Sequence, residues 1–207
     1  MSDDGRPVSN SLFDLAPPDI AWFRERSDII LVPIGSLEQH GAHLPLGTDT
    51  ITALEVSRRA AAKADVPYTP PLWAGYSPQH LRDTESGVGT VTLRASTLNE
   101  VLYDVARSLI HHGWNKLVFV NGHGSNTKVI DPLLRRIKYE TGAFVALYKP
   151  YAERYIGLLD DLLENPRVGA TTCTGPVASL SRSATMRPSA VSSSASSRTS
   201  VATGLWK

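Results

Sequence analysis

The chain has a single cysteine, Cys173, among its 207 residues, which excludes an internal disulfide framework and fits a reducing compartment. No stretch approaches the roughly 18 apolar residues of a membrane-spanning helix, and the amino terminus lacks the basic start and apolar run of a signal peptide. The net charge of +1 does not favour a nucleic acid or an anionic membrane surface as a partner. With 42% apolar residues, the composition is typical of a soluble globular protein. The single cysteine and the expected lack of a signal peptide or membrane span predict a cytoplasmic location.

Acidic residues and histidines are absent from the carboxy-terminal segment. All 20 acidic side chains lie at or before Glu164, and residues 165–207 contain no histidine but ten serines. Residues 1–164 carry 16 basic and 20 acidic side chains, a net charge of −4, whereas residues 165–207 carry +5. Ser-rich sequence of this kind buries too little apolar surface to offset the entropy lost on ordering. We therefore predict a globular domain over residues 1–164 and a disordered tail over residues 165–207.

The predicted domain alternates between strand and helix patterns. Short apolar runs predict strands at 28–34, 116–120 and 143–147. A further short strand at 66–69 would lie at an edge or a strand start because it contains Pro67. Helices are predicted at about 51–63, at 98–112 with a capping box formed by Thr97 and Glu100, and from the end of the loop 121–126 to Gly142. The alternation predicts an α/β fold with a mostly parallel sheet and helices on both faces.

Two polar clusters follow predicted strands at their carboxyl ends, where α/β sheets bind ligands. Glu38, His40 and Asp49 follow the first strand, and His123 lies in the turn Asn121-Gly122-His123-Gly124-Ser125-Asn126 after the second. Two imidazoles and two carboxylates suit Zn²⁺, Mn²⁺ or Fe²⁺. The clusters thus indicate a candidate divalent metal site, in which a carboxylate such as Asp49 can bridge two ions.

Each of these residues also has a structural interpretation. Asp49 could cap the helix that follows it, Glu38 could be a solvated loop charge, and His123 could be a turn residue. A phosphate-binding turn is a further alternative for the 122–124 segment, although it lacks the lysine and spacing of a P-loop. We assign no site role to His43, His111 or His112.

The joint pattern of motifs resembles the creatininase (creatinine amidohydrolase) family over about residues 10–164. The matching segments are Pro33-Ile34-Gly35-Ser36-Leu37-Glu38-Gln39-His40-Gly41-Ala42-His43-Leu44-Pro45-Leu46-Gly47-Thr48-Asp49-Thr50, Gly75-Tyr76-Ser77-Pro78-Gln79-His80, Gly89-Thr90-Val91-Thr92-Leu93 and Asn121-Gly122-His123-Gly124-Ser125-Asn126. The resemblance implies a three-layer α/β/α sandwich, commonly a hexamer, with two Zn²⁺ or Mn²⁺ ions. Glu38, Asp49 and His123 would bind one ion, and His40 and Asp49 the other.

The resemblance also implies the reaction, which is hydrolysis of a cyclic amide or a related ring compound, a small-molecule substrate. Ser77 and His80 are expected to contact that substrate, with a surface-loop role as the alternative for His80. A carbocyclic diketone of the dehydro-inosose type is the second substrate class. The chain as given could instead be an inactive metal-binding remnant, or a small-molecule binding module without catalysis.

Two features depart from the family pattern. Creatininase has a glutamate ligand at the position of Ser125, and most relatives instead use a later His-Ala-Gly-Glu-like segment, but this chain has no histidine after His123. With suitable codons, a shifted reading frame from Cys173 onward would encode a histidine followed by small residues and a glutamate. We therefore hypothesise a frameshift near residues 165–172, which sequencing of the gene across codons 160–180 would test; a natural flexible tail is the alternative.

Overall fold

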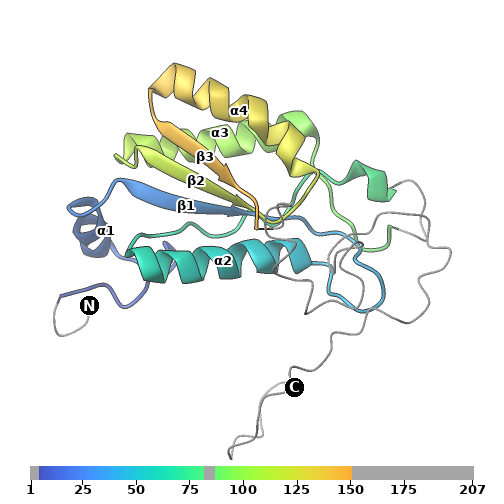
Figure 1. Ribbon diagram of the computed structural model, residues 1–207, viewed down its shortest axis with the longest axis horizontal. Coiled ribbons are helices and arrows are strands. Elements are labelled where there is room, and N and C mark those ends of the chain that lie inside the picture. The colour runs from blue at the N-terminus through green and yellow to red at the C-terminus, as the bar shows by residue number, and fades with distance from the viewer. Residues whose placement is uncertain (1–4, 82–86, 151–207) are drawn as a thin grey trace, which may run out of the picture.

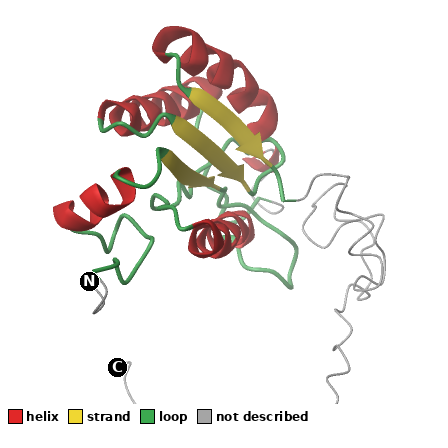
Figure 2. Cartoon of the chain, turned by 60° about the vertical axis from the view of Figure 1, so that its left-hand side comes forward, coloured by secondary structure: helices red, strands yellow, loops and turns green. Residues whose placement is uncertain are grey.

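The computed structural model describes residues 5–81 and 87–150. Three parallel strands form one sheet in the order β1 (Ile29–Ile34), β2 (Lys116–Asn121) and β3 (Phe144–Tyr148). Helix α2 (Thr48–Ala64) lies on one face, and helices α3 (Ala95–His111) and α4 (Asn126–Thr141) cover the other (Figure 1). Figure 2 shows the three layers from a second direction. The predicted three-layer α/β/α sandwich is confirmed.

The strands have apolar side chains on both faces because both faces are covered by helices. In β1, Ile30, Val32 and Ile34 are at most 2% exposed and pack in the larger core, which also contains the apolar faces of α3 and α4. Leu31 points to the opposite face and joins a smaller core with Ala61 of α2. The alternation along the strand is what builds the two interfaces of the sandwich.

Most predicted elements are present, with shifted boundaries. Helix α2 begins at Thr48, three residues earlier than predicted, so that Asp49 lies in its first turn. Helix α3 begins at Ala95 with Arg94 as its N-cap, so the predicted capping box of Thr97 and Glu100 is wrong.

One predicted strand is absent as a regular strand, and one helix was not predicted. The segment 66–69 forms no regular strand; only Tyr68 makes isolated parallel bridges, to Ser11 and Leu31. A helix that was not predicted, α1 (Pro17–Arg24), starts with two prolines at positions where a missing N–H costs little.

Close backbone contacts bring the strand ends against the start of α2. A Cβ atom added to Gly122 would lie 2.1 Å from the carbonyl oxygen of Asp49, and one added to Gly35 would lie 2.2 Å from Thr50 Oγ1. Only glycine allows the ends of β1 and β2 to approach the helix this closely. The first turn of α2 is therefore held directly over the carboxyl end of the sheet.

The described residues contain no helix that is long and apolar enough to cross a membrane. The predicted tail at 165–207 lies outside the described residues, as does the end of the predicted domain at 164.

Candidate metal centre

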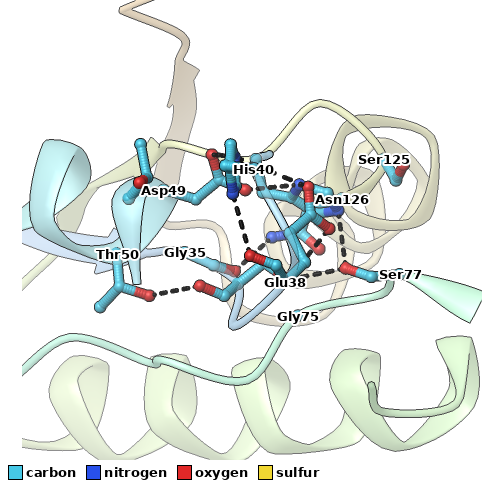
Figure 3. A network of polar contacts seen from close by, with 12 residues as sticks. Gly35, Glu38, His40, Asp49, Thr50, Gly75, Ser77, Ser125 and Asn126 are labelled. Atoms are coloured by element: carbon cyan, nitrogen blue, oxygen red, sulfur yellow. Dashed lines mark hydrogen bonds and ion pairs between the residues drawn. The ribbon is translucent and has the colours of Figure 1, made fainter. Parts of the chain in front are cut away.

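The four predicted metal ligands come together at the carboxyl end of the sheet. Glu38 and His40 come from the loop after β1, Asp49 from the first turn of α2, and His123 from the turn after β2. Each of these residues is at most 5% exposed. Ligand atoms of Glu38, His40 and Asp49 all lie within 4.8 Å of one another, as a shared metal ion requires. Residues up to 85 positions apart in the chain thus form one cluster, part of which is visible in Figure 3.

Asp49 presents one oxygen to each histidine. Its Oδ1 lies 3.1 Å from His40 Nε2, and its Oδ2 lies 2.8 Å from His123 Nδ1. Glu38 Oε1 completes the cluster at 3.3 Å from His123 Nδ1 and 3.9 Å from His40 Nε2. A carboxylate placed between two imidazoles in this way can bridge two cations.

The ring of His40 is oriented by its own loop. Its Nδ1 lies 3.0 Å from the backbone carbonyl of Glu38. A carbonyl oxygen only accepts hydrogen bonds, so Nδ1 must carry the proton in the neutral ring. Nε2 is then left with a lone pair that faces the carboxylates.

The ring of His123 has the opposite orientation. Its Nε2 lies 3.1 Å from the carbonyl of Tyr76 and 3.0 Å from Ser77 Oγ. The carbonyl again requires the proton, so Nε2–H donates and the lone pair lies on Nδ1. The two histidines therefore present different ring nitrogens to the same pair of carboxylates, each fixed by a backbone acceptor.

Charge coupling in this buried cluster shifts the pKa values of its members. Burial opposes the charged form of His123, but the carboxylates of Asp49 and Glu38 outweigh it and raise its pKa to about 9. Burial likewise opposes the charge on His40, and Asp49 together with the Glu38 carbonyl raises the pKa of its ring. Burial favours protonated Asp49, yet the two imidazoles hold the pKa of that carboxyl below its usual value. The site thus strongly favours positive charge between its carboxylates.

One buried oxygen of the cluster lacks a hydrogen bond. Within the described residues, Asp49 Oδ2 accepts no hydrogen bond of normal geometry, although His123 Nδ1 lies 2.8 Å away. A buried carboxylate oxygen without a hydrogen bond is costly, and a cation bound between it and the ring nitrogen would remove that cost. The donor set of two imidazoles and two carboxylates is also one that Zn²⁺ and Mn²⁺ accept. The residues present fit a divalent metal ion.

A network of buried side-chain amides supports the cluster, and the sequence did not predict this role for the two asparagines. The fully buried Asn126 side chain donates to the Gly35 carbonyl at 3.0 Å and accepts from the Tyr76 N–H at 2.9 Å. Asn121 binds both the N–H and the carbonyl of His123. The signal available in the sequence was two asparagines flanking the Gly-His-Gly turn at a strand end, where buried polar side chains need internal partners.

The two predicted substrate contacts lie at different depths. Ser77 is fully buried, with its Oγ 2.6 Å from Ser36 Oγ and 3.0 Å from His123 Nε2. The side chain of His80 is 15% exposed, and its Nε2 lies 3.7 Å from Glu38 Oε1. Ser125 accepts a hydrogen bond from Gln79 at 2.9 Å and lies to one side of the cluster in Figure 3. A substrate role for Ser77 and His80 stays a prediction.

Fold and site together define an α/β/α sandwich with a buried carboxylate–imidazole centre at the carboxyl end of its parallel sheet. The family model described as creatinine amidohydrolase matches residues 14–194. The chain therefore belongs to the creatininase family. The match continues past Glu164, beyond the change in composition.

Curated relatives with several different activities match the chain. A mycofactocin precursor peptide peptidase of Mycobacterium ulcerans is 38% identical over 120 residues, which are 54% of this chain and 46% of that protein. The creatinine amidohydrolase of Pseudomonas putida is 33% identical over 54% of this chain and 45% of that protein. The 3-dehydro-scyllo-inosose hydrolase of Thermotoga maritima is 32% identical over 48% of this chain and 31% of that protein. The chain spans about half, or less, of the length of these relatives.

Solved structures with the same fold include metal-bound forms by their descriptions. A mutant creatininase of the Zn–Zn type has a TM-score of 0.63 and 26% identity, with coverage of 80% of this chain and 67% of that chain. A creatininase described as the Mn form has a TM-score of 0.59 and 27% identity, with coverage of 74% of this chain and 61% of that chain.

Proposed function

We propose that this chain is the metal-binding part of a divalent metal-dependent hydrolase that cleaves an amide C–N bond. The observation that carries the proposal is Asp49, a buried carboxylate whose two oxygens face the ring nitrogens of His40 and His123. Oδ2 has no hydrogen-bond partner of normal geometry within the described residues. Glu38, His40, Asp49 and His123 would hold two Zn²⁺ or Mn²⁺ ions, as the Zn–Zn and Mn descriptions of the structural relatives suggest.

The residues of the chain prepare the site before any substrate arrives. The backbone carbonyls of Glu38 and Tyr76 orient the two rings, so that little reorganisation is needed on binding. A divalent ion held there supplies Lewis-acid polarisation of a carbonyl and acidifies water near neutral pH. Burial of all four side chains keeps bulk solvent from screening their charges.

For the substrate, we propose a cyclic amide or a related ring compound, consistent with the creatinine amidohydrolase relative. A peptide amide is the second candidate, because relatives named mycofactocin precursor peptide peptidase are 36–38% identical. A carbocyclic diketone is a third candidate, supported by the inosose hydrolase relative. All three would place a carbonyl group at the same pair of ions.

Metal analysis of the purified chain tests the proposal first. About two Zn²⁺ or Mn²⁺ ions per chain, lost on His123→Ala, are expected for the enzyme. One ion, with no turnover, would instead identify an inactive metal-binding remnant, and no bound metal would refute the proposal. Turnover of the metal-loaded protein with creatinine, a short peptide and an inosose diketone would then separate the substrate classes.

We also propose a homo-oligomer, as the family resemblance implies, which light scattering of the metal-loaded protein would test. A monomer at all concentrations would contradict it.

A further inference from the structure

One carboxylate oxygen has three histidine rings around it. His123 Nδ1, His80 Nε2 and His40 Nε2 lie 3.3, 3.7 and 3.9 Å from Glu38 Oε1. The four-residue cluster accounts for two of these rings. His80 is the third, and it lies outside the four-residue cluster.

His80 points inward from a turn whose other residues point outward. It lies in the 3-10 turn η1 (Pro78–Leu81), in which Pro78, Gln79 and Leu81 are exposed. Its own side chain is only 15% exposed. The ring faces the buried Glu38 carboxylate, and its Nε2 lies 3.7 Å from Oε1, beyond the distance of a direct hydrogen bond.

Three hydrogen bonds hold the turn, so the position of His80 is defined. The Ser77 N–H donates to Thr92 Oγ1 at 2.8 Å before the turn, and the His80 N–H donates to the Ser77 carbonyl at 3.1 Å within it. Gln79 Nε2 donates to Ser125 Oγ at 2.9 Å, which ties the turn to the start of α4. These bonds hold His80 over Glu38.

The distance between His80 and Glu38 is a few tenths of an ångström longer than that between two atoms sharing a cation. Two donors bound tetrahedrally to Zn²⁺ at about 2.0–2.1 Å lie roughly 3.3 Å apart. The distance from His80 Nε2 to Glu38 Oε1 is 3.7 Å, between the values for the two rings already assigned to the metals. A shift of a few tenths of an ångström would bring it to ligand spacing.

We propose that His80 Nε2 is a further metal ligand, binding the same ion as Glu38. This inference rests on the proposed metal centre and extends it. The four-residue cluster offers only two nitrogen donors for two ions, and Ser125, bound to Gln79, lies to one side of it. His80 raises the number of imidazole ligands to three.

The test compares His80→Ala with His43→Ala in the full-length chain. His43 is a matched control, because it is a histidine on the exposed part of the loop after β1. Binding of Zn²⁺ is measured by competition with a chromophoric chelator, and Co²⁺ is bound in parallel to record its visible absorption. We expect His80→Ala to lose at least about tenfold in affinity for one ion and to change the Co²⁺ spectrum, while His43→Ala binds as the unmodified chain does.

Two further measurements separate ligation from a structural role. Added imidazole should enter the space left in His80→Ala and restore the Co²⁺ spectrum, which a misfolded protein would not show. Gln79→Ala keeps the ring but removes its anchor to Ser125, and should weaken binding less than His80→Ala does.

The outcomes are distinct. Unchanged Zn²⁺ affinity and an unchanged Co²⁺ spectrum in His80→Ala would overturn the inference while leaving the proposed hydrolase intact; an accompanying rise in KM alone would assign His80 to the substrate. Absence of metal from the unmodified chain would instead refute the proposed function and this inference together.

Discussion

At the scale of single residues, Asp49 links the two halves of the site. Its oxygens lie 3.1 Å from one ring and 2.8 Å from the other, and its side chain is only 6% exposed. No other described carboxylate contacts both His40 and His123 with separate oxygens. The properties of both rings therefore depend on this one charge.

Asp49→Asn should abolish binding of both ions. The amide keeps the shape of the side chain but removes the charge that balances the metals, so we expect affinity to fall more than about 100-fold. Metal content after desalting measures the effect. Asp131→Asn is the matched control, because Asp131 is 61% exposed and pairs only loosely with Arg135 at 3.7 Å; two ions retained by Asp49→Asn would contradict the bridging role.

The pKa of His123 predicts how the stability of the metal-free protein depends on pH. The folded-state pKa is about 9 and the ordinary value is 6.5, so between these pH values the folded protein binds more protons than the unfolded chain. The stabilising contribution is complete below pH 6.5 and is lost as pH rises through about 9, by up to about 3 kcal/mol. Urea unfolding with chelator present, at several pH values across this window, measures it.

The variant His123→Gln provides the comparison for this slope. It keeps a polar side chain but has no group that titrates in the window, so most of the decline in the free energy of unfolding should disappear. The raised pKa of His40 acts in the same direction and leaves a smaller slope. Equal slopes in both proteins would show that His123 is not the group responsible.

Residue types and motif spacing were sufficient to predict that the four side chains proposed as ligands lie together. Glu38, His40, Asp49 and His123 each follow a strand end, and the sheet topology brings such ends together. The orienting carbonyls of Glu38 and Tyr76 could not be predicted, because a backbone group has no signature in the sequence. The inward position of His80 depends on the Gln79–Ser125 contact between distant segments, which spacing alone does not reveal.

At the scale of elements, the contact between α2 and the strand ends positions Asp49. Gly122 follows β2 and lies directly against the backbone of Asp49, with no room for a side chain. The helix and the His123 turn are thus in contact through main-chain atoms.

Gly122→Ala should force these two elements apart. Its Cβ would lie 2.1 Å from the Asp49 carbonyl, and relief of that overlap should cost about 1–3 kcal/mol of unfolding free energy and weaken metal binding. Gly124→Ala is the control, since a Cβ there meets nothing within 4 Å. Urea unfolding and metal titration of both variants check the prediction, which similar behaviour of the two would contradict.

Asn126 should matter for stability and for metal binding at once. Asn126→Ala would leave the Gly35 carbonyl and the Tyr76 N–H without their partner, at about 1–3 kcal/mol for each buried group. It would also loosen the Tyr76 carbonyl that orients His123. Lys128→Ala, at an exposed position of the same helix, should change the unfolding free energy by no more than about 0.5 kcal/mol.

The elements that were predicted well have strong internal patterns. The β-branched runs of β1 and β2 and the apolar face of α3 are regular over many residues. Helix α1 was missed because its eight residues give too short a pattern. The segment 66–69 has strand composition, but its only bridges among the described residues are isolated ones, from Tyr68 to Ser11 on one side and to Leu31 on the other.

At the scale of the whole molecule, metal and fold should stabilise each other. The proposed ligands come from three segments that only the folded chain brings together, so an ion that binds the folded state raises its stability. At a free Zn²⁺ concentration 100 times the Kd, the gain is about 2.7 kcal/mol for one ion. Thermal unfolding with Zn²⁺ and with a chelator measures it; Mg²⁺, which prefers all-oxygen sites, should have a smaller effect. Identical curves with Zn²⁺ and with chelator would contradict the prediction.

The chain matches the family over most of its own length but over less than half of the length of three relatives. The family match covers residues 14–194, yet the chain spans 46% or less of the length of the three relatives compared above. The proposed site residues all lie between Gly35 and Asn126. Sequencing of the gene across codons 160–180 tests the reading-frame hypothesis.

The source of ring orientation has an evolutionary consequence. His40 depends on a peptide group two positions away in its own loop, whereas His123 depends on one 47 positions away. The first arrangement can be inherited as a short, self-contained unit that tolerates change elsewhere. The second tolerates substitution of residue 76, because only the backbone carbonyl is used, but not an insertion or deletion that displaces the main chain there. Homologues should therefore conserve the length of the loop around residue 76 more strictly than its side chains.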